Sequence, residues 1–145
     1  MKKCFAAVTA LFLLAACLCL PAQAASKKLV EVLMTTPGVT AAAAEAAQAP
    51  TDDQLDDALR ACSVEIAPGA ALTPGRMTLL GTGVISSDDP DFWVSFKIWS
   101  TLERSIGLFF RADGEEEWTL LAVNLGDVIE SAFPASGTYA IAVGW

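Results

Sequence analysis

Two tryptophans and a lysine on one predicted strand are the residues best suited to binding chemistry. In the segment 92–99 the even positions are all apolar, whereas Trp93, Lys97 and Trp99 stand at odd positions. Side chains alternate between the two faces of a strand, so these three share one face, with the indoles about 20 Å apart at about 3.3 Å per residue. Exposed aromatic rings with polar neighbours can grip sugar rings or a partner protein. We therefore predict a binding surface for a glycan or a protein.

An acidic loop before this strand carries the residue types that calcium prefers. Asp88, Asp89 and Asp91 stand close together in the sequence, and calcium takes about six to eight oxygen ligands. Their spacing does not match the EF-hand loop, and short acidic runs commonly form solvated turns. Calcium at these three residues is one hypothesis and a hydrated turn is the other. The sequence implies no other cofactor.

The composition excludes several kinds of catalysis. The chain contains no histidine, which removes Ser-His-Asp and Cys-His nucleophilic sites and histidine-based zinc and iron centres. Ser95 and Lys97 share a strand face, but a pair at this spacing is a common coincidence. Paired carboxylates could still hydrolyse glycosidic bonds. We expect a non-catalytic protein, with a carboxylate-dependent secreted hydrolase as the alternative.

The chain begins with a segment typical of export. Lys2 and Lys3 precede an uncharged run from Cys4 to Leu20, which Pro21 ends, and Ala22 and Ala24 follow. A cationic start, an apolar stretch and a small-x-small end make a secretory signal, and the run is short for a membrane span. We predict a signal peptide over residues 1–24, cleaved after Ala24.

A second interpretation of the same segment places a lipid on Cys17. Leu14 to Cys17 resembles a lipobox, but the apolar run continues past it, which favours ordinary cleavage. We expect a secreted or extracytoplasmic protein that meets the membrane only through its signal or, in the alternative, through a lipid anchor on the membrane surface. No sorting motif or apolar tail precedes Trp145, so we expect a complete small protein with no further anchor.

The rest of the chain is strongly acidic. Without residues 1–24 it has seven cationic and seventeen acidic residues, a net charge of −10. Such a surface repels phosphate backbones, so we exclude nucleic acid as a partner. Only Cys62 of the four cysteines would remain, which rules out an internal disulfide. The apolar neighbours of Cys62 indicate that its side chain is small and buried. The sequence does not indicate the oligomeric state.

Residues 25–50 are rich in alanine and poor in aromatic side chains. The stretch 29–34 could be a strand or a helical turn. Thr40 could cap a helix that Pro50 must end, although a helix of alanines buries little surface and is marginal unless it docks. We expect this part to be a partly flexible segment before a single globular domain at 51–145.

A stronger helix is predicted at the start of that domain. Thr51 and Gln54 have the spacing of a capping box, and acidic residues fill the first turn. Four apolar side chains then recur at helical spacing on one stripe: Leu55, Ala58, Leu59 and Cys62. The pattern predicts a helix over residues 52–62 with one face buried.

The sequence after residue 62 has the pattern of short strands. Aromatic and β-branched residues alternate with polar ones, and turn residues interrupt them at short intervals. Asp113 and Gly114 predict a hairpin turn between the segments 106–111 and 118–123. Six or seven strands without helical intervals indicate a mostly β protein, an antiparallel β-sandwich preceded by a short helical N-terminal segment.

Several features of residues 92–145 also occur together in one kind of domain. They are the alternating strand 92–98, a strand ending at Arg111, Gly114 followed by Trp118, a strand from Asp127 to Phe133, and Ser136 before a last apolar strand. This part resembles the small Ig-like β-sandwich modules of exported and cell-surface proteins of Gram-positive gut bacteria. The resemblance implies an Ig-like fold and an extracytoplasmic location. Such modules share no catalytic residues, so it implies no site.

The position of the helix decides whether the tryptophan face is free. A helix with one apolar stripe has to bury that stripe against a sheet. We therefore expect the helix to pack across the strand face that carries Trp93 and Trp99. An open face would instead favour the binding surface. The functional classes are thus an exported non-catalytic module that binds a glycan or protein or has a structural role, and a hydrolase with two sheltered carboxylates.

Overall fold

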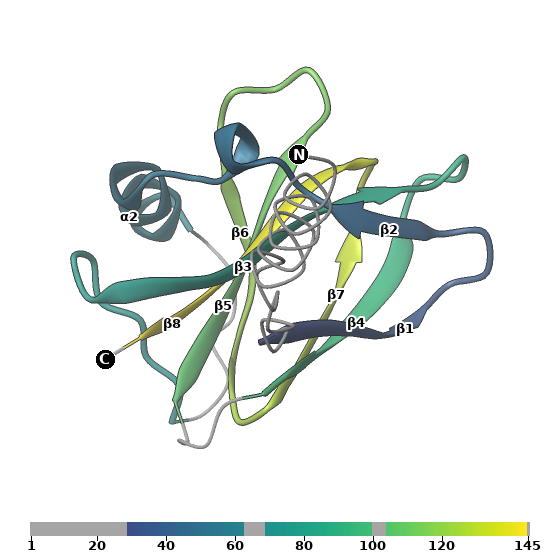
Figure 1. The fold of residues 1–145 in the computed structure, drawn as a ribbon. Coiled ribbons are helices and arrows are strands. Elements are labelled where there is room, and N and C mark those ends of the chain that lie inside the picture. Colours follow the sequence, from purple (N-terminus) through teal and green to yellow (C-terminus); the bar gives the residue numbers. More distant parts are fainter. Residues whose placement is uncertain (1–28, 63–68, 100–103, 145) are drawn as a thin grey trace, which may run out of the picture.

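The computed structural model describes residues 29–62, 69–99 and 104–144. The predicted signal peptide, including Cys17 and Ala24, lies outside the described residues, and so do residues 63–67 at the start of the stretch in which short strands are predicted. Within the described ranges the chain is mostly β, with two antiparallel sheets and one short α-helix (Figure 1). No helix in these ranges is long and apolar enough to cross a membrane.

The two sheets differ in size. The smaller sheet has the order β1-β4-β7 and consists of Val30–Thr35, Phe92–Ile98 and Val128–Phe133. The larger sheet has the order β2-β3-β8-β5-β6 and consists of Thr40–Ala43, Met77–Ser86, Gly137–Gly144, Ser105–Ala112 and Thr119–Leu125. All neighbouring strands are antiparallel. The mostly β antiparallel fold is confirmed, whereas the Ig-like assignment stays a prediction.

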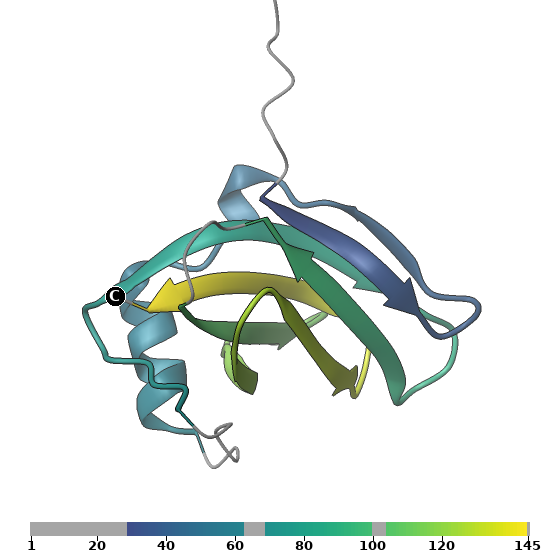
Figure 2. The same cartoon turned by 90° about the horizontal axis from the view of Figure 1, so that it is seen from below.

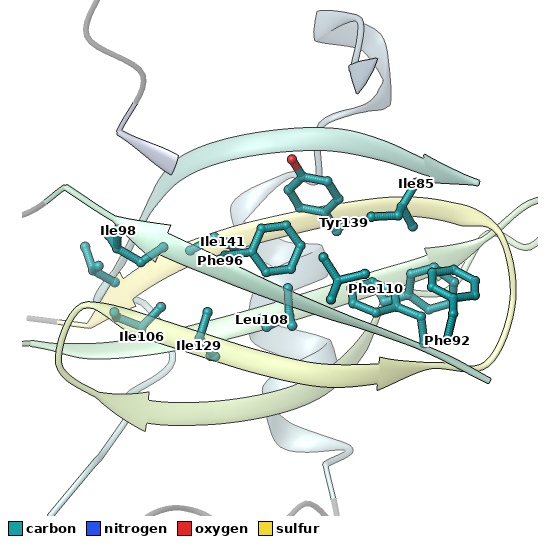
Figure 3. Close-up of a cluster of buried hydrophobic side chains, with 13 residues drawn as sticks. Ile85, Phe92, Phe96, Ile98, Ile106, Leu108, Phe110, Ile129, Tyr139 and Ile141 are labelled. Carbon is teal, nitrogen blue, oxygen red and sulfur yellow. The ribbon is translucent and has the colours of Figure 1, made fainter. Parts of the chain in front are cut away.

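An aromatic-rich core fills the space between the inner faces of the sheets (Figure 3), whose strands are seen from below in Figure 2. The even positions of β4 are buried, as their alternation predicts. Phe133 of β7 stacks on Phe92 of β4, with ring centroids 5.7 Å apart, and meets Phe110 of β5 edge-on at 5.3 Å. Offset and edge-on pairs are favourable arrangements of aromatic rings. Because the even side chains of β4 are held in this core, the odd ones point outward.

The α-helix begins where the sequence predicts. α2 covers Asp52–Arg60, and the Thr51 hydroxyl accepts a hydrogen bond from the Gln54 amide at 3.2 Å. The Thr51 amide donates in return to the Gln54 side chain at 2.9 Å, which completes the capping box. The predicted helix is confirmed and ends two residues before Cys62.

The apolar stripe of α2 packs on the larger sheet. Leu55 and Ala58 are buried, and Cys62 is partly buried against the same cluster. The buried strand residues of this cluster come from β5, β6 and β8: Phe109, Leu120, Val123, Ala140 and Ala142. In β8 these alanines alternate with Tyr139, Ile141 and Val143 of the central core. The helix therefore covers the outer face of the larger sheet.

The alanine-rich segment forms strands instead of a helix. Thr40 lies opposite Ser86 and Ala43 opposite Gly83 in the pairing of β2 with β3. A single 3-10 turn, η1, follows at Ala46–Gln48. The predicted helix from Thr40 to Pro50 is wrong, because pairing with β3 outweighs a weak helix propensity. Since β1 and β2 belong to the two sheets, the described chain has eight strands, more than the six or seven predicted.

The predicted hairpin turn is present between β5 and β6. The Glu115 amide donates to the Ala112 carbonyl at 3.0 Å, and Gly114 has a φ of 82°. This left-handed conformation is accessible to glycine at little cost. The two strands pair antiparallel, so the Asp-Gly interpretation is confirmed.

Candidate functional site

The tryptophan face of β4 is open. Trp93 is 55% exposed and Trp99 is 57% exposed. α2 lies beside the larger sheet, away from β1 and β4 (Figure 1). The prediction that the helix covers Trp93 and Trp99 is wrong. Ala140 and Ala142 leave room for the helix on the outer side of β8, and the stripe is buried there.

The binding face is defined here as seven residues on the outer side of the smaller sheet. The register of β4 with its neighbours places Glu31 beside Lys97, and Met34 and Glu130 on either side of Ser95. Seven residues make up the binding face: Glu31, Met34, Trp93, Ser95, Lys97, Trp99 and Glu130. The structure thus brings the predicted binding residues together and adds neighbours from β1 and β7. The sequence did not show these neighbours because strand pairing selects them.

At one end of the binding face the polar groups bond to each other. The Trp99 indole N–H donates to the Glu31 carboxylate at 3.1 Å, and the Lys97 ammonium lies 5.6 Å from the centre of the Trp99 ring. Lys97 also forms a salt bridge with Asp127. The hydrogen bond and the positive charge of Lys97 lower the pKa of the Asp127 carboxyl. Lys97 therefore acts here as a fixed, neutralised part of the surface.

The other end of the binding face is hollowed. Trp93 borders an open hollow of about 250 Å³, together with Met34, Ser95 and Glu130. The Trp93 amide donates to the Thr36 hydroxyl at 2.9 Å, which fixes the backbone next to the ring. Glu130 is exposed and makes no salt bridge to any described residue. This end offers an aromatic ring, a hydroxyl and a carboxylate to a ligand.

The acidic loop between β3 and β4 does not assemble a calcium site. No group of three acidic, cysteine or histidine side chains in the described ranges is placed to hold a metal ion. Asp88, Asp89 and Asp91 lie at the surface, and the Asp89 amide donates to the Ser87 hydroxyl at 3.2 Å. Asp91 has a φ of 57°, a conformation that aspartate tolerates in turns. The structure shows these residues as a turn and does not bring their carboxylates together.

A second hollow of about 290 Å³ lies between α2 and the residues before β6. Asp57, Glu116 and Glu117 border it, and all three are exposed. Asp57 is paired with Arg60 at 3.2 Å. A hydrolase would need sheltered carboxylates, and these are in water. The sequence did not show this hollow, because it exists only where the helix docks.

A comparison of the chain with protein-family models, curated proteins and solved structures finds no match. The functional assignment therefore rests on the geometry of the chain's own residues.

Proposed function

We propose that this protein is an exported, non-catalytic module that binds a glycan through the binding face. The observation that carries the proposal is the exposure of Trp93 and Trp99 on one side of β4, with Ser95 and Lys97 between them. Indole rings offer flat apolar surfaces to the C–H faces of sugars, and the polar groups can reach hydroxyls. A strand holds the rings in a line about 20 Å long, which suits an extended ligand.

The charges between the rings favour a glycan over a protein partner. Protein interfaces are depleted of charged residues at their centres. Here Lys97 and Glu31 lie side by side within the binding face. Exposed Leu33 and Met34 extend the apolar surface along β1, and they provide further contact area beside the tryptophans.

Export is part of the same proposal. The cationic start, apolar run and Ala22-x-Ala24 ending support a signal peptide at residues 1–24. The resemblance to Ig-like modules belongs here too, and two antiparallel sheets around one core support it. Mass spectrometry of the protein from its native host tests the location. An N-terminus at Ala25 means free secretion, a lipid on Cys17 means a tethered protein, and an unprocessed Met1 contradicts export.

Binding is tested with a panel of linear oligosaccharides, neutral and charged. We expect Trp93→Ala and Trp99→Ala each to weaken binding about tenfold or more, since one central aromatic contact is worth on the order of 2 kcal/mol. Leu125→Ala is the matched control, because Leu125 is also an exposed apolar residue, 44% exposed, but lies outside the binding face. Equal losses in all three variants, or no binding to any oligosaccharide, would contradict the proposal. In the second case a protein partner should be sought.

A further inference from the structure

The binding face carries an excess of negative charge. The face has two carboxylates, those of Glu31 and Glu130, and one ammonium group, that of Lys97, which is already paired with the neighbouring Asp127. The whole chain after residue 24 is also strongly acidic. A ligand that covers this face therefore meets a negative potential, which favours a cationic ligand and disfavours an anionic one.

The charges at the two ends of the face have different surroundings. At the Trp99 end, Lys97 bonds to Asp127 and the Trp99 indole bonds to Glu31, so these groups are already occupied. At the Trp93 end, Glu130 has no salt bridge within the described chain. Of the described residues that border the hollow, Glu130 alone is charged. The available negative charge is thus at the hollow.

The geometry of the hollow fits an ammonium group. Glu130 lies opposite Ser95 and diagonal to Trp93 on the same face, and diagonal neighbours in antiparallel strands have Cβ atoms about 7–8 Å apart. A cation between them can bond to the carboxylate while it stays within about 6 Å of the indole centre, the range of a cation–π contact. The Ser95 hydroxyl can accept a further N–H. Ring, carboxylate and hydroxyl together match a protonated amine.

We propose that the hollow beside Trp93 binds a protonated amino group, so that the preferred ligand is a glycan with free amines. The inference rests on the proposed glycan-binding function and adds the chemical class of the ligand. Trp93 provides the aromatic surface and Glu130 provides the charge that separates an amino sugar from its acetylated form. Trp99 contacts the next part of the ligand and does not discriminate between charged and neutral sugars.

The test compares two probes, short oligomers of glucosamine and the same oligomers with every amine acetylated. Binding to the purified protein is measured by calorimetry at about pH 6, where a primary amine is protonated. We expect the amine-bearing oligomer to bind about fivefold more tightly, as one exposed ion pair permits. Glu130→Gln should lower the affinity for the amine-bearing oligomer about fivefold, so that the two oligomers bind equally. Glu115→Gln, which removes an exposed carboxylate elsewhere, should keep the preference.

Ionic strength gives a second measurement. Added salt should weaken the binding of the amine-bearing oligomer to the unaltered protein and to the Glu115→Gln control, because salt screens an exposed ion pair. The same addition of salt should have a smaller effect on the binding of this oligomer to Glu130→Gln. Equal affinities for the two oligomers, or a preference that survives in Glu130→Gln, would overturn the amine proposal while the glycan proposal stands. No binding of either oligomer overturns the amine proposal, and the wider oligosaccharide panel then decides the glycan proposal.

Discussion

In both sheets side chains alternate between an inner and an outer face, but one outer face is covered by a helix and the other is exposed to solvent. On the larger sheet the outward side chains of β8 include Ala140 and Ala142, and both are buried in one cluster with Leu55 and Ala58 of α2. On the smaller sheet Trp93 of β4 and Trp99, which directly follows β4, are more than half exposed. Alanines let a helix approach the strand closely, whereas two indoles would hold it at a distance. Side-chain size on an outer face thus helps to decide which face a helix can cover.

The largest expected effect is on the covered side. Leu55→Ala removes a side chain that is 1% exposed and leaves a cavity between α2 and the larger sheet. We expect the free energy of unfolding to fall by about 2–5 kcal/mol, measured by urea denaturation. A loss below about 1 kcal/mol would mean that the helix is not firmly docked, and the contrast between the two faces would fail.

The start of the helix should have a smaller effect. Thr51→Ala removes the hydroxyl that accepts from the Gln54 amide. We expect a loss of about 1 kcal/mol in the free energy of unfolding. Thr51→Ser retains the hydroxyl and serves as the control. If both variants lose the same amount, the cap does not account for the effect.

The open side should tolerate truncation. Trp93→Ala should change the free energy of unfolding by no more than about 0.5 kcal/mol, because most of the ring is in water. Quenching of tryptophan fluorescence by acrylamide measures the same exposure directly. In a Trp145→Phe background, which removes the tryptophan outside the described residues, the additional changes Trp93→Phe and Trp99→Phe should remove most of the quenchable fluorescence, while buried Trp118 resists quenching. A large loss of stability in Trp93→Ala would show that the face is covered in solution.

The smallest effect concerns the salt bridge on the open side. Lys97 lowers the pKa of Asp127 in the folded state below its ordinary value of 3.8. A lowered pKa stabilises the fold above the unfolded-state value, and this contribution is lost as the pH falls through the folded-state value. The melting temperatures of the unaltered protein and Lys97→Met should therefore converge as the pH drops below about 4. A difference that stays constant over this range would contradict the assignment.

Local patterns predicted the elements that depend on nearby residues. The capping box at Thr51, the turn at Gly114 and the alternation of β4 each rest on interactions within a few positions, and all three are present. The two tryptophans could be placed on one face for the same reason. Their neighbours Glu31 and Glu130 could not, because pairing with β4 joins positions more than thirty residues apart.

Competition between distant partners explains the errors. The segment Thr40–Ala43 favours a helix when it is alone, but in the protein it adds an edge strand to β3. The apolar stripe of α2 showed that one helix face is buried without showing on which sheet. Both outcomes depend on surfaces that exist only after the sheets have formed, and no short window of sequence contains them.

The larger sheet is complete only when β8 is in place. This last strand, Gly137–Gly144, is the middle strand of the larger sheet, and every residue in it is buried. Until it is available, β3 and β5 have no partner between them and the helix has no alanine surface to dock on. Such non-local pairing also slows folding. The larger sheet of such a chain is completed only when β8 is available, which is compatible with the export proposed above.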